Sequence, residues 1–230
     1  MLDRLKVRAI TLDLDDTLWP IWPTIARAER QLQDWLRERA AATADLLADD
    51  LQRHGLREQV MRERPDLKHQ LSAIRTEMIR RALKQAGDDP VLAEPAYAVF
   101  HASRQQVDLF DDARPALEFL AARYPVVALS NGNASVEAVG LGRFFHASIS
   151  AESFGVGKPE PAIFHAAATA AGAAPHEVLH VGDDASLDVL GALACGMQTV
   201  WVNREDHLWP HAEQPHETVN NLHELTELLR

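Results

Sequence analysis

The apolar positions of this chain change their spacing twice along the sequence. Residues 7–14 (VRAITLDL) form a short β-branched and aliphatic run, which is typical of a buried strand that ends at acidic residues. Between residues 24 and 107, apolar residues recur at helical spacing in a segment rich in Ala, Leu, Arg, Glu and Gln. We therefore predict a helical bundle there, with breaks near Gly55, Pro65 and residues 87–90.

Beyond residue 108, short apolar runs alternate with helix-like patterns. This alternation predicts strands at 126–130, 147–150, 177–182 and 198–203, and helices at 112–123, 134–140, 159–171, 185–195 and 220–229. Short aliphatic strands separated by helices are typical of a parallel sheet covered on both faces. The sequence thus predicts an α/β core, residues 1–17 and 108–230, with a helical domain, residues 18–107, inserted after the first strand.

The charge of the chain is unevenly distributed. The whole sequence has a formal net charge of −11 at pH 7, so we expect no nucleic-acid or anionic-membrane partner, because such binding rests on basic surface. Residues 18–107 hold 14 basic and 13 acidic side chains, so the acid excess belongs to the α/β core. This division suits a core that holds a cation and arginines that face an anionic substrate, although a solvated helical surface explains most of those arginines.

The sequence shows no signal for export or for membrane insertion. Residues 1–16 place acids and bases around a short apolar run, unlike a secretory signal. No stretch approaches the roughly 18 consecutive apolar residues of a membrane span. Cys195 is the only cysteine, which excludes an internal disulfide and makes a cytoplasmic location the expectation. We expect a monomer or a homodimer.

Polar groups follow the predicted strands at their carboxyl ends, where open α/β sheets bind their ligands. Asp13 and Asp15 follow the first strand, and their spacing turns both carboxylates toward one site while Leu14 points to the core. Two adjacent acids repel each other unless a cation lies between them. Carboxylate oxygens are the ligands that Mg²⁺ prefers, so we predict Asp13, Asp15 and Asp183 as metal ligands.

The two acids after the first strand suit different steps of a phosphoryl transfer. Asp13 can attack phosphorus as the nucleophile and form an aspartyl-phosphate. Asp15 can protonate the leaving oxygen and later deprotonate the attacking water. Ser130, the backbone around Asn131, and Lys158 can supply hydrogen-bond donors and positive charge to the transferring oxygens.

Each acidic motif has a second interpretation when it is taken alone. The segment DLDDT at 13–17 could be a calcium loop or a helix cap, but an EF-hand would need glycine where Leu18 stands and glutamate where Thr24 stands. The segment GDD at 182–184 is weak evidence by itself, because Gly-Asp commonly makes a turn. Ser130 and Lys158 stand in order between the two motifs, and together with them favour the catalytic interpretation.

Four segments resemble, in order and spacing, the signature motifs of the haloacid dehalogenase-like hydrolases: DLDDT at 13–17, SN at 130–131, the lysine of GKPEP at 158, and GDDASLDVLGA at 182–192. The resemblance spans the whole chain and implies a Rossmann-like core with the helical insertion as a cap. It implies Asp13 as nucleophile and metal ligand, Asp15 as acid/base, Thr17 in support, Ser130 on the phosphoryl oxygens, Lys158 for charge neutralisation, Asp183 as metal ligand and Asp188 as second acid. Asp184 stands where many relatives carry serine, so its role is left open between supporting the metal ligands and facing the metal.

The segments TLDLDDTLW, LSNGNASVEAVGLGRFF and VLHVGDDASLDVLGALACGMQTVW also resemble a bacterial branch of this family. That branch dephosphorylates flavin mononucleotide and a riboflavin precursor, 5-amino-6-(5-phospho-D-ribitylamino)uracil. The resemblance implies a Mg²⁺-dependent phosphatase of small phosphorylated metabolites. Trp19 and Trp22 then either stack on a substrate ring or pack in the linker, and the candidate anion contacts of the insertion are Arg75, Arg80 and Arg81.

Three rival functions use similar residues. A 2-haloacid dehalogenase releases halide, which leaves without a proton, so Asp15 and the acidic last motif would have no purpose in it. A phosphomutase shares every chemical residue named above and differs in how the cap excludes water. A noncatalytic receiver-like module is much shorter and has no helical insertion. The 11 histidines, His180 among them, show no zinc-type spacing and are predicted to be surface or core residues.

Overall fold

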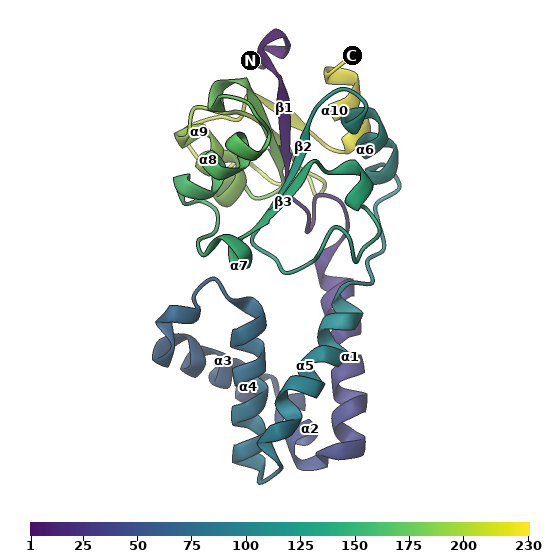
Figure 1. Cartoon of the computed structure of the whole chain (residues 1–230), viewed down its shortest axis with the longest axis vertical. Coiled ribbons are helices and arrows are strands. Elements are labelled where there is room, and N and C mark those ends of the chain that lie inside the picture. Colours follow the sequence, from purple (N-terminus) through teal and green to yellow (C-terminus); the bar gives the residue numbers. More distant parts are fainter. The chain divides into compact units, whose positions relative to one another are not determined.

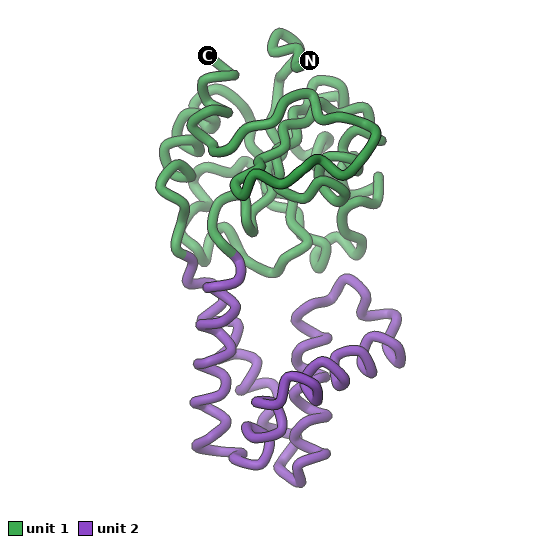
Figure 2. The backbone as a smooth tube through the Cα atoms, turned by 180° about the vertical axis from the view of Figure 1, so that it is seen from behind, with its two compact units in different colours: residues 1–20, 108–230 green, residues 21–107 purple.

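The computed structural model describes residues 1–230 and divides them into two compact units (Figure 2). The core unit comprises Met1–Pro20 and Asp108–Arg230, and the helical unit comprises Ile21–Val107. The first boundary thus follows residue 20, whereas the sequence places it after residue 17. No helix in either unit combines the length and the apolar character that a bilayer-spanning segment needs.

A six-stranded parallel sheet, in the order β3-β2-β1-β4-β5-β6, forms the centre of the core unit (Figure 1). The strands are β1 (Ala9–Leu12), β2 (Val126–Ser130), β3 (Ala147–Ser150), β4 (Val178–Gly182), β5 (Gln198–Val202) and β6 (Glu217–Val219). All residues of β1, β2, β4 and β5 are buried, as expected for parallel strands with helices on both faces. The predicted α/β fold with an inserted helical region is confirmed.

Helices cover the sheet on its two faces (Figure 1). Helices α8 (Pro161–Ala170) and α9 (Gly191–Ala194) lie on one side, and α6 (Ala113–Ala121) and α10 (Leu222–Leu228) lie on the other; the short helix α7 (Ala151–Phe154) follows β3. Ala9, Val127 and Phe164 belong to one buried apolar cluster that joins α8 to β1 and β2. Side chains alternate across a strand, so Thr11 shares the α8 face with Ala9.

Residues 136–140 form consecutive turns and no helix begins at 134, so the helix predicted over 134–140 is wrong. One helical hydrogen bond is made, from Val139 N–H to the Ser135 carbonyl at 3.0 Å. Gly140 then adopts a left-handed conformation, φ 76°, which ends the turn. A single hydrogen-bonded turn does not repay the cost of helix nucleation, and the chain continues into the connection to β3.

Residues 185–195 are predicted as one helix, and they divide instead into a π-helical segment, Ala185–Leu190, followed by α9. The Val189 N–H donates to the Asp184 carbonyl, five residues back, at 3.2 Å. Such widened turns are frequent at functional sites. Here the widened turn contains Asp188, an acid of the last predicted motif.

The helical unit has an apolar core of its own. Its helices are α1 (Ile21–Arg39), α2 (Ala41–Ala48), α3 (Asp50–Glu63), α4 (Leu71–Ala86) and α5 (Ala93–Arg104). Leu32, Leu36 and Ile79 are among the fully buried residues that hold these helices together. The break expected at Gly55 is wrong, because α3 continues through this residue; a glycine costs a helix only about 1 kcal/mol relative to alanine.

The other two predicted breaks of the helical unit are present. Pro65 begins a short 3-10 turn, Pro65–Leu67, after α3 ends. Gly87 ends α4 in the left-handed conformation, φ 81°, that glycine adopts most readily. Turn chemistry therefore predicts these two helix ends correctly.

Candidate active site

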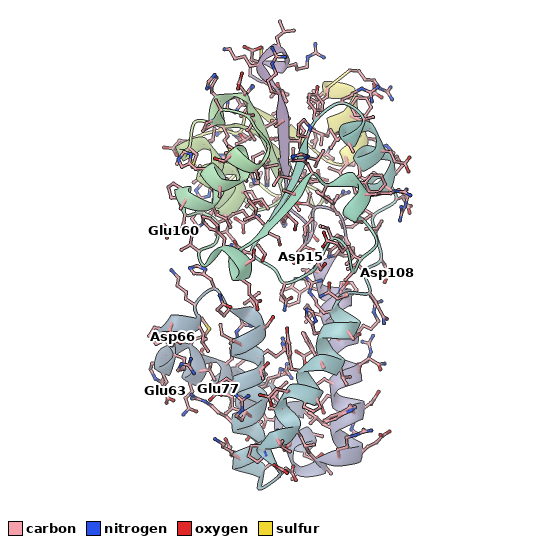
Figure 3. All side chains as sticks on the ribbon, viewed as in Figure 1. Asp15, Glu63, Asp66, Glu77, Asp108 and Glu160 are labelled. Atoms are coloured by element: carbon pink, nitrogen blue, oxygen red, sulfur yellow. The ribbon has the colours of Figure 1, made fainter.

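The carboxyl ends of β1, β2 and β4 bring the predicted site residues together. β1 lies between β2 and β4, with Leu12 paired to Ala128 on one side and to Val181 on the other. Asp13 follows β1 directly, and its N–H donates to the Val181 carbonyl at 2.9 Å. The chain proceeds outward in opposite directions on the two sides of β1, which is where open α/β sheets form their ligand sites. Figure 3 shows Asp15 just beyond this end of the sheet.

A buried ionic cluster lies at this strand edge. Lys158 Nζ donates to Asp13 Oδ1 and to Asp188 Oδ1, each at 2.5 Å. The Lys158 side chain is 3% exposed and that of Asp188 is 1% exposed. Carboxylate oxygens of Asp13, Asp183 and Asp188 all lie within 4.8 Å of one another. Three acids therefore share the positive charge of one lysine in a site from which water is largely excluded.

The pKa values of the cluster follow from its burial and from this charge imbalance. Burial raises the pKa of Asp13 well above its usual value, and the charges of Asp188 and Asp183 add to the increase while Lys158 opposes it. Burial, reinforced by the charge of Asp188, raises the pKa of Asp183 to about 7. Asp188 and Lys158 behave differently: burial disfavours both charges, but their mutual attraction outweighs burial, so the pKa of Asp188 is lowered and that of Lys158 is raised.

The cluster fits a divalent cation. Burial and the charges of neighbouring acids raise the pKa values of Asp13 and Asp183, so a bound cation would stabilise both carboxylates in their ionised form. Hard carboxylate oxygens are the ligands that Mg²⁺ prefers. We predicted Asp13, Asp15 and Asp183 as ligands; the structure groups the side chains of Asp13 and Asp183 with Asp188, and that of Asp15 lies outside this group.

Asp188 is already bonded to protein donors on both oxygens. Its Oδ1 accepts from Lys158 and faces His180 Nε2 at 3.1 Å, and its Oδ2 accepts from the Asp184 N–H at 3.0 Å. These contacts suit an acid that orients Lys158, and they leave Asp13 and Asp183 as the better candidates to hold a metal. Gly182 permits this packing, since a Cβ there would lie 2.3 Å from Asp188 Cγ.

His180 is a buried partner of the site that the sequence does not reveal. It lies on β4, with Nδ1 at 2.8 Å from Thr11 Oγ1 and Nε2 toward Asp188. Burial lowers the pKa of His180, so the ring is neutral, with the Thr11 hydroxyl donating to Nδ1 and the Nε2–H donating to Asp188. The sequence does place a polar residue, His180, within an otherwise apolar strand, which is buried throughout. A buried histidine whose hydrogen bonds are all made inside the core gives the same pattern, so it does not by itself indicate a site residue.

The remaining predicted residues have defined contacts. Ser130 is buried at the end of β2, and its Oγ accepts from the Gly132 N–H at 2.9 Å. The Asn131 amide bonds the backbone of Lys158 twice, accepting from its N–H at 2.7 Å and donating to its carbonyl at 2.9 Å. Asn131 therefore holds the segment that presents Lys158. Thr17 donates its hydroxyl to Asp183 Oδ1 at 2.9 Å.

Asp184, whose role the sequence leaves open, caps the π-helical segment. Its Oδ1 accepts from the Ser186 N–H at 2.8 Å and from the Leu187 N–H at 2.7 Å. This pattern is that of an N-cap acid. The Asp184 carboxylate thus fixes the turn that contains Asp188 and lies outside the group of acids that could hold a metal.

Arg204 ties two distant segments of the core unit together. Its guanidinium makes two bonds of 3.0 Å to the Asp112 carboxylate and one of 2.9 Å to the Thr17 carbonyl, and it lies 3.9 Å over the Phe110 ring. The carbonyl that it holds belongs to the same threonine that bonds Asp183. No local pattern predicts this contact, because Arg204 and Thr17 are 187 residues apart.

The aromatic and basic candidates of the entry segment and the insertion differ in exposure. Trp19 is fully buried, which excludes its ring as an open stacking surface, whereas Trp22 is 75% exposed. Arg75 bonds Glu29 at 2.6 Å and lies over the Phe100 ring. The other two arginines also have carboxylate partners inside the helical unit, namely Glu77 and Glu94 for Arg80, and Glu63 and Glu77 for Arg81. A substrate anion would compete with these partners.

Comparison with known proteins agrees with this arrangement. Residues 7–196 match the haloacid dehalogenase-like hydrolase family. The chain is 34% identical to the 5-amino-6-(5-phospho-D-ribitylamino)uracil phosphatase YigB of Escherichia coli, with 97% of each chain covered. It is 33% identical to a phosphoserine phosphatase of Thermus thermophilus, over 56% of this chain and 55% of that one.

Among solved structures, a 2-haloacid dehalogenase from Pseudomonas syringae superposes with a TM-score of 0.92 at 36% identity, covering 97% of this chain and 98% of that one. Both the sequence match and the superposition extend through the helical insertion as well as the core, since each covers nearly the whole chain. The predicted resemblance is therefore confirmed, and the chain belongs to the haloacid dehalogenase-like hydrolases.

Proposed function

We propose that this protein is a Mg²⁺-dependent phosphatase that hydrolyses phosphate monoesters through an aspartyl-phosphate on Asp13. The observation that carries the proposal is the buried cluster in which Asp13 is bonded to Lys158 and faces Asp183, with Asp15 two residues further along the chain. Lys158 holds Asp13 in a defined position and offsets its charge, so the carboxylate can face an anionic phosphate.

In the first step, an oxygen of Asp13 forms a bond to phosphorus and the ester oxygen leaves. Asp15 gives its proton to this oxygen, so an alcohol departs. In the second step, water attacks the phosphorus of the aspartyl-phosphate while Asp15 takes up a proton from it. The bond between phosphorus and Asp13 breaks, which releases inorganic phosphate and restores the carboxylate.

Asp13 and Asp183 would hold the Mg²⁺, and the cation, when bound, supplies positive charge to the phosphoryl oxygens. Ser130 lies buried at the end of β2, where its hydroxyl can donate to a phosphoryl oxygen. Lys158 adds the charge of its ammonium group from the same edge of the sheet. These groups are fixed by the fold before the substrate arrives, as electrostatic catalysis requires.

The narrower proposal is that the substrate is flavin mononucleotide or a phosphorylated riboflavin precursor. It rests on the likeness to YigB, which extends over 97% of both chains. A panel of phosphorylated metabolites assayed with Mg²⁺ tests it. Flavin mononucleotide should rank above simple sugar phosphates and nucleoside monophosphates, and an equal or lower rank would exclude the flavin proposal while leaving the phosphatase proposal intact.

A 2-haloacid dehalogenase is the second candidate, because a solved structure of that description superposes closely on this chain. The acids favour the phosphatase. Halide leaves without a proton, so the second acid Asp15 would have no role in dehalogenation. The reaction also needs no metal, so it would not use the cation that Asp13 and Asp183, with their raised pKa values, are suited to hold. Chloride release from 2-chloropropionate, with no phosphate released from any ester, would reverse this choice.

The phosphatase proposal predicts that Asp13→Asn abolishes hydrolysis of para-nitrophenyl phosphate, because an amide cannot form the aspartyl-phosphate. The loss should be at least about 10³-fold. Asp45→Asn is the matched control, since it makes the same chemical change at an exposed position of α2 and should keep full activity. Activity retained by a folded Asp13→Asn protein would disprove the nucleophile assignment.

A further inference from the structure

The indole of Trp19 makes a hydrogen bond that neither of its two predicted roles includes. The side chain is fully buried, and its Nε1–H donates to Asp15 Oδ1 at 2.8 Å. A buried indole needs an acceptor for its N–H. Here the acceptor is the carboxylate to which the proposed function gives the acid and base work.

The backbone fixes this contact. Asp15 and Trp19 form an isolated bridge, and the Asp16 N–H donates to the Trp19 carbonyl at 2.8 Å. Asp16 takes a left-handed conformation, φ 57°, which turns the chain back on itself between the two residues. The Phe110 N–H donates to the Leu18 carbonyl at 3.0 Å and ties the far side of this turn to the returning chain.

The other indoles of the core unit give their protons to different acceptors. Trp201 Nε1–H donates to the Asp183 carbonyl at 2.7 Å, and Trp209 Nε1–H donates to the Glu213 carbonyl at 2.8 Å. Both of these acceptors are backbone groups that do not change their protonation. Trp19 differs, because its acceptor is a side-chain carboxylate that must gain and lose a proton in each proposed cycle.

The chemistry of the indole decides which oxygen carries that proton. An indole N–H is a donor and never an acceptor, so Asp15 Oδ1 must accept from it whether Asp15 is ionised or protonated. The carbonyl oxygen of a protonated carboxyl is the better acceptor, so this bond favours the proton on Oδ2. The acid thus presents its proton from one defined atom, and the same atom can take a proton from water in the second step.

We propose that Trp19 is a positioning residue for Asp15, which it holds so that Oδ2 is the atom that exchanges protons with the leaving group and with water. This inference rests on the proposed phosphatase function. It goes beyond that function in giving a task to a residue outside the reacting groups. A residue that served only to fill space could give its N–H to a backbone carbonyl, as Trp201 and Trp209 do.

The test compares esters that need an acid with esters that do not. Phenyl phosphate has a poorly acidic leaving group, so breaking its ester bond depends on proton donation, whereas 2,4-dinitrophenyl phosphate releases a stable anion. The parameter to measure is kcat/KM, because it reports the steps through formation of the aspartyl-phosphate and not the later hydrolysis. Trp19→Phe should lower kcat/KM about 10-fold to 100-fold for phenyl phosphate and less than about 3-fold for the dinitrophenyl ester.

The ratio of the two kcat/KM values is the decisive quantity, since a partly unfolded preparation lowers both and leaves the ratio unchanged. Trp19→benzothienylalanine, which replaces the N–H by sulfur at nearly constant shape, should change the ratio in the same direction. Trp209→Phe is the matched control and should leave the ratio at the wild-type value. Asp15→Asn should also lower kcat/KM more for phenyl phosphate than for 2,4-dinitrophenyl phosphate, and its loss on phenyl phosphate should exceed that of Trp19→Phe.

A ratio that stays at the wild-type value in Trp19→Phe and in the benzothienylalanine protein would show that Trp19 only packs, and would overturn the proposal. This failure is distinct from failure of the proposed function. In the latter case the wild-type protein itself hydrolyses neither ester. Wild-type activity on both esters, with selective loss in the two Trp19 variants and an unchanged Trp209→Phe ratio, is the outcome that supports the proposal.

Discussion

Lys158 in the core unit and Arg81 in the helical unit are each bonded to two carboxylates. Lys158 lies between Asp13 and Asp188, and Arg81 lies between Glu63 and Glu77. Their surroundings differ. The Lys158 side chain is 3% exposed, whereas that of Arg81 is 19% and that of Glu63 47% exposed, and Figure 3 shows Glu63 at the outside of the helical unit.

This difference separates a chemical site from a structural ion pair. Water screens the charges around Arg81, so such pairs contribute little to stability and leave their groups in ordinary ionised states. Around Lys158, burial raises the pKa values of Asp13 and Asp183, and the neighbouring acids, which one lysine does not balance, raise them further. The same pattern of one base and two acids therefore has a function only where the fold removes water and adds a further charge.

The largest expected effect comes from removing the buried cation. Lys158→Met would leave Asp13 and Asp188 buried without their counter-charge, and removal of one partner of a buried pair costs about 3 to 5 kcal/mol of folding stability. Phosphatase activity should fall at least about 10²-fold. Denaturant unfolding and para-nitrophenyl phosphate assays measure both. Unchanged stability would mean that the cluster is hydrated in solution.

A second, smaller effect concerns pH and metal. The pKa of Asp183 rises from its ordinary value of 3.8 to about 7 in the fold, so the folded protein binds this proton more tightly than the unfolded chain does. That contribution stabilises the fold at low pH and is lost as the pH rises from about 4 to about 7. The melting temperature of the metal-free wild type should therefore fall across this window relative to Asp183→Asn.

Mg²⁺ should reverse that loss. Above pH 7 the cation binds the ionised carboxylates, so added Mg²⁺ should raise the melting temperature of the wild type and have little effect on Asp183→Asn. Thermal scans in EDTA and in millimolar Mg²⁺ make the comparison. Parallel melting curves for the two proteins at every pH would contradict the assignment of Asp183 as a metal ligand.

The smallest effect is expected from Arg81→Met, which makes the same kind of change as Lys158→Met in the solvated ion pair. Because partly exposed pairs contribute much less than buried ones, the melting temperature should shift by about 2 °C or less, with kcat for para-nitrophenyl phosphate unchanged. A loss of stability as large as that of Lys158→Met would show that exposure does not separate the two clusters. A large rise in KM would instead indicate that Arg81 contacts the substrate.

Local patterns in the sequence determine the fold class and most of the site. Apolar runs with β-branched residues predict β1, β2, β4 and β5, and parallel pairing then collects their carboxyl ends at one edge. Asp13 and Asp183 follow two of these strands directly, Ser130 ends a third, and Lys158 lies shortly before α8, so their meeting follows from the topology. The short edge strand β6, with three residues, lacks enough apolar positions to be predicted.

Only the tertiary structure decides which polar groups bond each other within that edge. Asp188 takes the place predicted for Asp15 in the acidic cluster because the turn after Asp184 is π-helical and because Gly182 leaves room for it. Asp15 turns to Trp19 because Asp16 adopts a left-handed conformation. Such choices depend on turn geometry and close packing between segments far apart in the chain, whereas the strands that carry the acids depend on neighbours in sequence.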